Sequence, residues 1–69
     1  MNIRVKIYLE ATNQKLEDFK AYRFIIWIGD KWDEWCKLNN KNYYHLIAKD
    51  HVEFDKWLIS NLKEGKLNE

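Results

Sequence analysis

Residues Tyr22–Ile28 read Tyr-Arg-Phe-Ile-Ile-Trp-Ile and form the most apolar run of the sequence. The run is too short to cross a membrane, because a spanning helix needs about 20 such residues. Aromatic and β-branched residues dominate it, which favours a central β-strand. Strand alternation divides it into Tyr22, Phe24, Ile26 and Ile28 on one face and Arg23, Ile25 and Trp27 on the other. Both faces are largely apolar, so we expect the rest of the chain to cover one, and a local flap or another protein to cover the second.

The size of the chain limits how much apolar surface it can bury by itself. A chain of 69 residues allows one domain, residues 1–69, with a thin core. Such a domain buries only about 60% of the surface that its unfolded chain exposes. Four Trp, four Tyr and three Phe supply bulky core side chains. Association with another molecule is a further way for a small fold to gain stability.

Charge and cysteine content narrow the possible environments. The net charge of +1 gives no overall electrostatic reason to expect nucleic acid or an anionic membrane as partner. Cys36 is the single cysteine, which excludes a disulfide within the chain and favours a reducing compartment. The N-terminus alternates apolar and polar residues without the continuous apolar segment of a signal peptide. We therefore expect a cytoplasmic protein.

Two further segments have the pattern of strands. Asn2–Glu10 alternates cleanly, with Ile3, Val5, Ile7 and Leu9 on an apolar side and Arg4, Lys6, Tyr8 and Glu10 on a polar side. This alternation is typical of a half-buried strand. Tyr43–Ala48 is interpreted as a third strand. Between the first two strands, Ala11–Phe19 fits either a loop with a short helical turn or an extended hairpin.

Two helices are predicted. Lys31–Leu38 follows Asp30, a suitable N-cap, and ends at Asn39-Asn40, because Asn tolerates the left-handed conformation. The second helix begins at Asp50, which forms a capping-box pattern with Glu53. An apolar stripe follows at Phe54, Trp57, Leu58, Asn61 and Leu62, and Gly65 provides the stop.

These elements predict an α+β fold in the order β–β–α–β–α. A small, mainly antiparallel three-stranded sheet would carry the C-terminal amphipathic helix on one face.

The aromatic excess suggests a protein-binding function. Trp27, Trp32, Trp35 and Ile59 are the candidate partner-binding residues, because Trp is enriched among residues that dominate binding energy. The competing interpretation places the two helical tryptophans in the core, as apolar stripes at helical spacing usually are. The favoured hypothesis is a non-catalytic inhibitor or adaptor that occupies a partner surface, as a homodimer. Its size and composition resemble phage and mobile-element products, which is an analogy only.

The alternative hypothesis is single-stranded nucleic-acid binding. Arg4, Lys6 and Tyr8 would share the outer face of the first strand, with Tyr43 and Tyr44 near them on the sheet. Basic and aromatic side chains on a sheet hold single strands through phosphate contacts and base stacking. An ordinary solvated strand face explains the same pattern, since no aromatic RNA-binding motif accompanies it.

Enzymatic and metal-binding functions have thinner support. Cys36 with His45 or His51 is the one nucleophile–base pairing to name, and no third orienting residue is evident. These three residues with Asp50 and Asp55 lack the spacing of a zinc site. We expect no catalysis, no metal and no cofactor.

Overall fold

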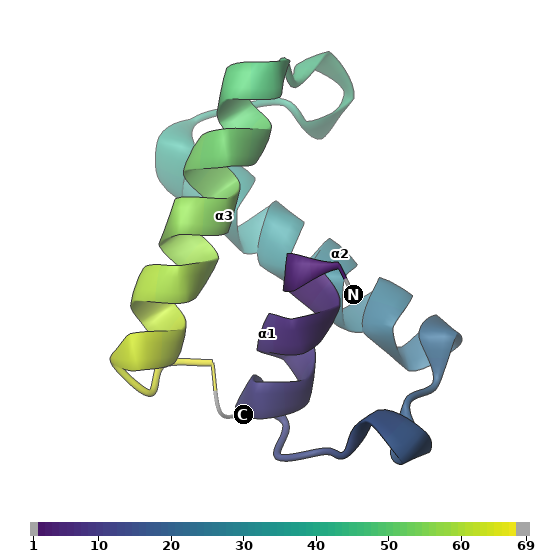
Figure 1. Cartoon of the computed structure of the whole chain (residues 1–69). Coiled ribbons are helices and arrows are strands. Elements are labelled where there is room, and N and C mark those ends of the chain that lie inside the picture. The colour runs from purple at the N-terminus through teal and green to yellow at the C-terminus, as the bar shows by residue number, and fades with distance from the viewer. Residues whose placement is uncertain (1, 68–69) are drawn as a thin grey trace.

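The computed structural model describes residues 2–67, and helices make up its regular secondary structure. The elements in chain order are α1 (Ile3–Ala11), η1 (Leu16–Asp18), α2 (Ala21–Asn39), η2 (Tyr43–His45) and α3 (Ala48–Lys63), where η marks a short 3₁₀ turn. No strand occurs between residues 2 and 67, so the predicted α+β fold with a three-stranded sheet is wrong. Helices α2 and α3 diverge from one end of the molecule, and α1 lies in the opening between them (Figure 1).

The predicted strand Asn2–Glu10 is instead helix α1. The Asn2 side chain caps it by accepting a hydrogen bond from the Arg4 backbone N–H at 2.8 Å. The buried residues of α1 are Ile7, Tyr8, Leu9 and Ala11, and Arg4 is half-buried. Of these, Arg4, Ile7, Tyr8 and Ala11 follow the helical spacing i, i+3, i+4, i+7. Alternation of aliphatic residues concealed this spacing, because Arg4 and Tyr8 count as polar although their long side chains pack inward.

The predicted central strand Tyr22–Ile28 forms the first half of α2, a helix of 19 residues. Strand propensity is a weak preference that packing overrides. Gly29 costs a helix only about 1 kcal/mol relative to Ala, so it does not end α2. In helical form the segment turns Phe24, Trp27 and Ile28 partly inward.

The third predicted strand, Tyr43–Ala48, is also wrong. Its first part is the turn η2, in which the Asn42 side chain accepts a hydrogen bond from the Tyr44 N–H at 2.9 Å. This side-chain turn fixes the connection between α2 and α3. Leu46 is half-buried, and Ala48 already belongs to α3.

The predictions of helix were more successful. Lys31–Leu38 lies within α2, and the helix predicted from Asp50 is present as α3, although it begins at Ala48. Asp50 is therefore not the N-cap; its carboxylate accepts the Ile47 N–H at 3.0 Å. Both predicted stops are confirmed, since Asn40 (φ 53°) and Gly65 (φ 69°) adopt left-handed conformations.

The core is organised around two stacked aromatic rings. The Trp32 indole lies on the Phe54 ring with centroids 3.6 Å apart and planes 12° apart. The Arg4 guanidinium of α1 lies 5.1 Å from the Trp32 centroid and 5.2 Å from the Phe54 centroid, and its Nε lies 2.6 Å from Asp55 Oδ1. One cluster therefore joins all three helices. Beneath it, Leu58 is fully buried.

A truncation at this stack tests the fold. Phe54→Ala is expected to lower the free energy of unfolding by about 3–5 kcal/mol, because it removes a fully buried ring and leaves a cavity. Urea unfolding followed by far-UV circular dichroism measures the change. The matched control is Tyr44→Ala, which removes a ring that is 88% exposed and should change stability by less than about 0.5 kcal/mol. Equal effects of the two substitutions would contradict this core.

Candidate functional site

Five exposed apolar or aromatic side chains lie on the first half of α2 and on η2. Each is more than half exposed, and together we call them the α2–η2 surface: Tyr22, Ile25, Ile26, Tyr43 and Tyr44. The first three follow helical spacing on the first half of α2, and the two tyrosines come from the turn that ends the α2–α3 connection. Grouped exposed apolar side chains mark interaction sites more often than scattered ones do.

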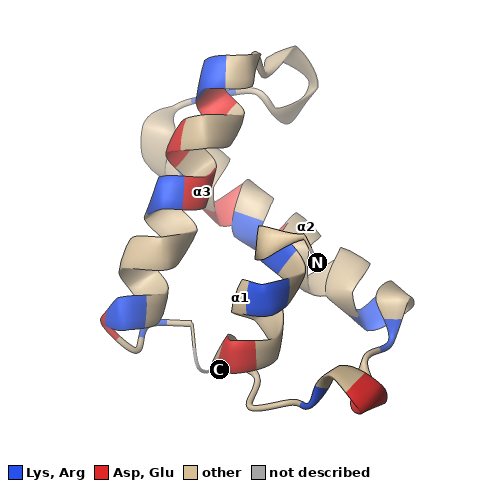
Figure 2. Ribbon diagram, viewed as in Figure 1, with Lys and Arg blue, Asp and Glu red and all other residues tan. Residues whose placement is uncertain are grey.

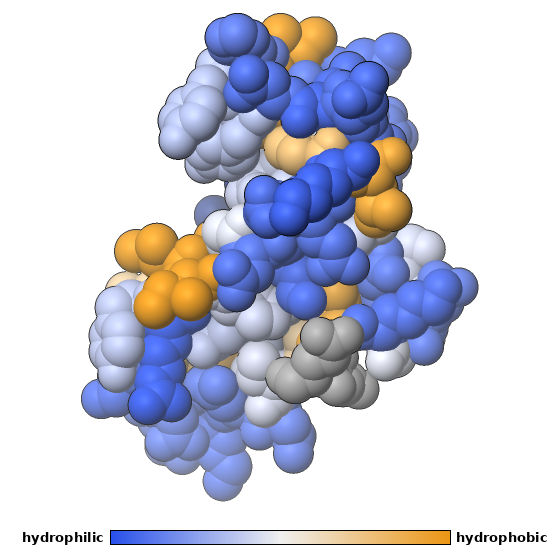
Figure 3. Space-filling view, turned by 180° about the vertical axis from the view of Figure 1, so that it is seen from behind, coloured by the Kyte–Doolittle hydropathy of each residue, from blue (hydrophilic) through white to orange (hydrophobic). Residues whose placement is uncertain are grey.

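Gly29 joins the two parts of this surface. It lies one helical turn after Ile25 and Ile26, and it lines a hollow of about 370 Å³ together with Asp33, Tyr43 and Tyr44. Figure 3 views the molecule from behind, with hydrophobic side chains grouped over the first half of α2 and a hollow above them. A Cβ added at Gly29 would meet no atom within 4 Å, so the backbone is open to a close approach here.

Charged residues border the α2–η2 surface. Arg23 lies over the Tyr22 ring, 5.9 Å from its centroid, and its Nε donates to the Tyr22 hydroxyl at 3.3 Å. Asp33 pairs with Lys37 at 3.0 Å one turn further along the helix, whereas Asp30 has no ion pair within residues 2–67. Figure 2 shows the uncharged stretch of α2 between the basic residue near its start and the charged second half.

The structure places the predicted partner-binding residues elsewhere. Trp32 and Trp35 are 5% and 4% exposed and belong to the core. Trp27 and Ile59 are half-buried and pack against that core. The four side chains do not form one exposed surface. Sequence reasoning missed the α2–η2 surface because Tyr22–Ile28 was interpreted as a strand, although the helical spacing was present in the sequence.

The predicted nucleic-acid surface is not assembled either. Tyr8 is 3% exposed and packs between Phe19, Phe24 and Trp27, with ring centroids 6.2, 5.5 and 5.3 Å away. Arg4 is half-buried and pairs with Asp55. Of the α1 residues proposed for this role, Lys6 alone is exposed, and Tyr43 and Tyr44 lie on η2. This surface depended on a strand that is absent, because helix α1 turns Arg4 and Tyr8 toward the other helices.

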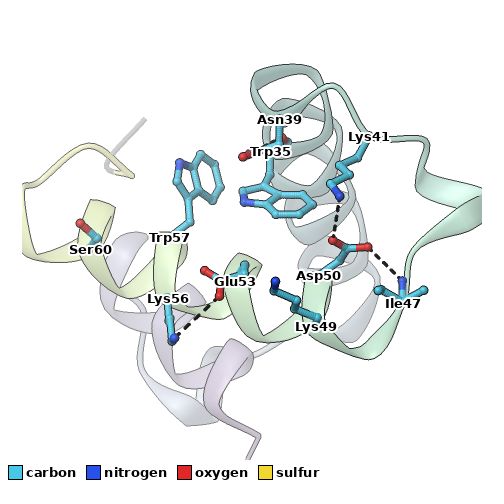
Figure 4. A pocket seen from close by; sticks show the side chains of 10 residues that line it. All are labelled: Trp35, Asn39, Lys41, Ile47, Lys49, Asp50, Glu53, Lys56, Trp57 and Ser60. Atoms are coloured by element: carbon cyan, nitrogen blue, oxygen red, sulfur yellow. Dashed lines mark hydrogen bonds and ion pairs between the residues drawn. The ribbon is translucent and has the colours of Figure 1, made fainter.

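A groove of about 610 Å³ lies between the second half of α2 and α3. Figure 4 shows the Trp35 and Trp57 indoles beside each other at its centre. The charged residues around them are largely neutralised within the chain, since Lys41 pairs with Asp50 at 3.4 Å and Lys56 with Glu53 at 3.8 Å. The complete lining is Trp35, Asn39, Lys41, Ile47, Lys49, Asp50, Glu53, Lys56, Trp57 and Ser60. The groove therefore lacks a convergent set of free charges that would favour one class of ligand.

The cysteine and histidines do not form a catalytic arrangement. Cys36 is buried on α2, and its thiol has no hydrogen bond to His45 or His51 in the described part of the chain. Burial raises the pKa of the Cys36 thiol, and the nearby carboxylates of Asp33 and Asp50 raise it further. His51 instead packs edge-on against Trp32, and its Nδ1 lies 3.3 Å from Arg4 Nη2.

Residues 2–67 contain neither a metal-binding cluster of side chains nor a helix that could span a membrane. Groups of three or more His, Cys, Asp or Glu side chains that could hold a metal do not occur in that range. No helix in it combines the length and apolarity needed to cross a membrane.

Comparisons with protein-family models, curated proteins and solved structures found no match for the chain.

Asp50 gives stability a defined pH dependence. The Ile47 N–H and the Lys41 ammonium hold the pKa of Asp50 below its ordinary value of 3.8. A lowered folded pKa means that the stabilisation is complete above the unfolded pKa and is lost as the pH falls through the folded one. Asp50→Asn keeps a side-chain oxygen but cannot titrate. The stability difference between wild type and Asp50→Asn, measured by urea unfolding, should shrink from pH 5 to pH 3. A difference independent of pH over this range would contradict the assignment.

The environment of Cys36 predicts a slow thiol. The thiolate is the form that reacts with alkylating agents. The raised pKa of Cys36 lowers the fraction of thiolate at neutral pH, and burial limits access of the reagent to the sulfur. Alkylation of the native chain by iodoacetamide at neutral pH should be at least about tenfold slower than alkylation of the urea-unfolded chain. Mass spectrometry over time measures both rates. Equal rates would contradict the burial of Cys36.

Proposed function

We propose that this chain is a small, non-catalytic protein-binding module that recognises another protein through the α2–η2 surface. It acts by occupying a surface of its partner, as an inhibitor or an adaptor does. The unpaired Cys36 favours a reducing compartment, so we propose the cytoplasm as its location.

One observation carries this proposal. Five large apolar or aromatic side chains stay more than half exposed on adjoining elements, while the core cluster contains all four tryptophans as buried or partly buried members. Tyrosine is among the residues that contribute most to binding energy at interfaces, because it combines a large apolar ring with a polar hydroxyl. The α2–η2 surface includes three tyrosines beside two isoleucines.

The contacts and burial of the residues proposed for nucleic-acid binding and for catalysis do not support those two functions. Nucleic-acid binding through α1 requires Tyr8 at the surface, and Tyr8 is buried. A Cys36 nucleophile requires an accessible thiolate next to a base, and Cys36 is buried without a histidine partner among the described residues.

Site-specific photo-crosslinking tests the proposal. A benzophenone amino acid replaces Ile26 or Tyr44 in cells that express the chain, and the control carries it at Lys63, an exposed position on α3. Ile26 and Tyr44 variants should form a defined protein adduct on irradiation, and the Lys63 variant should not, because only the first two positions lie on the α2–η2 surface. Mass spectrometry identifies the adduct. Adducts of equal yield at all three positions, or none at Ile26 and Tyr44, would overturn the proposal.

A further inference from the structure

We propose that the occupant of the α2–η2 surface is a second copy of this chain, docked with its α2 antiparallel across a two-fold axis near Gly29. This inference rests on the proposed function and names the partner.

The open backbone at Gly29 sets the point of closest approach. Tyr22, Ile26, Gly29 and Asp33 follow each other at i, i+4, i+7 and i+11 on the outer side of α2. Nothing occupies the space beside Gly29, so a second helix can approach its backbone more closely than at any neighbouring position. An antiparallel pair centred between Ile26 and Gly29 places Ile26 of each copy against Gly29 of the other.

Charges on one flank of α2 determine the direction of the pair. Arg23 and Asp30 are seven residues apart, two helical turns, and therefore lie on the same flank of the helix. Neither has an ion pair within residues 2–67. The Arg23 side chain donates to the Tyr22 hydroxyl and lies over the Tyr22 ring. A two-fold antiparallel arrangement brings Arg23 of each copy beside Asp30 of the other. A parallel two-fold arrangement would place this flank of the two copies on opposite sides of the interface, so Arg23 of one copy could not reach Asp30 of the other.

In the antiparallel pair, the flank of α2 opposite Arg23 and Asp30 is apolar and aromatic. Ile25 lies on that side of the first half of α2, and Tyr43 and Tyr44 lie beside the second half, around the hollow that Gly29 lines. Antiparallel pairing therefore brings Ile25 of one copy toward Tyr43 and Tyr44 of the other. The surface is self-complementary on both flanks, as an isologous two-fold interface must be.

Charge reversal with rescue tests the inference on the full chain. Sedimentation equilibrium from about 1 μM to about 1 mM should show a monomer–dimer equilibrium for the wild type. Arg23→Glu and Asp30→Lys should each weaken the dimer about tenfold or more, because each sets like charges opposite each other twice per dimer. The double variant Arg23→Glu/Asp30→Lys restores both pairs with reversed sign, and its dissociation constant should return to within about threefold of the wild type.

Matched controls separate this effect from changes in net charge or folding. Lys63→Glu and Glu10→Lys make the same changes in charge at exposed positions on α3 and α1, and both should leave the dimer unchanged. Urea unfolding should show that all variants remain folded.

A monomeric wild type over the whole range, or a dimer insensitive to both charge reversals, would overturn the inference. The proposed function is tested separately by the benzophenone adduct at Ile26. An adduct with a second copy of the chain would support both proposals, an adduct with a different protein would support the binding module and overturn the pairing, and the absence of any adduct would overturn both.

Discussion

Helix α2 has to continue through Gly29, because its inward-facing side chains pack against α1 in its first half and against α3 in its second half. Its first half meets α1 where Trp27 lies 5.3 Å from the Tyr8 ring. Its second half meets α3 where Trp32 stacks on Phe54. A break at Gly29 would leave each half too short to hold its position alone, since helices of fewer than about 12 residues are marginal in water. Tertiary packing on both sides thus maintains the helix across its weakest residue.

The same continuity produces the exposed apolar surface. Once residues 22–28 are helical, inward packing uses Phe24, Trp27 and Ile28, and no further element within residues 2–67 covers Tyr22, Ile25 and Ile26. A chain this small buries a smaller share of its surface than a larger domain does, which leaves less of the chain to cover this face. The proposed pairing of α2 with a second copy covers this face without requiring any rearrangement of the core.

The helix ends and the C-terminal helix were predicted from the sequence more accurately than the overall fold. The helix stops at Asn40 and Gly65 depend on the conformation of single residues, which the residue types predicted. The amphipathic pattern of α3 depends on one helical period, which is evident in the sequence. Tyr22–Ile28 failed because strand propensity in a short window competed with a helical period that becomes visible only when the pattern is followed past Gly29. For α1, Ile3, Val5, Ile7 and Leu9 suggested strand alternation. In the helix Ile7 and Leu9 are buried together with Tyr8 and Ala11, whereas Ile3 is exposed.

The candidate site could be predicted from the sequence only in part, because its position depends on the fold. The sequence indicated that Tyr22–Ile28 has more apolar surface than the chain can cover, and in the structure three of its side chains are more than half exposed. Which side chains face outward could not be derived, because strand and helix periods divide the same residues differently. Trp32 and Trp35 were candidates for binding because of their residue type. Only three-dimensional packing shows that both indoles contact the buried Phe54 ring of α3.

The most direct test of this account is the backbone conformation of residues 22–28 in solution. Assigned ¹³Cα and ¹³Cβ chemical shifts distinguish helix from strand at each residue. The account predicts helical shifts without interruption from Tyr22 through Gly29 and on to Trp35. Strand-type shifts over Tyr22–Ile28, or a loss of helical shifts at Gly29-Asp30, would contradict it.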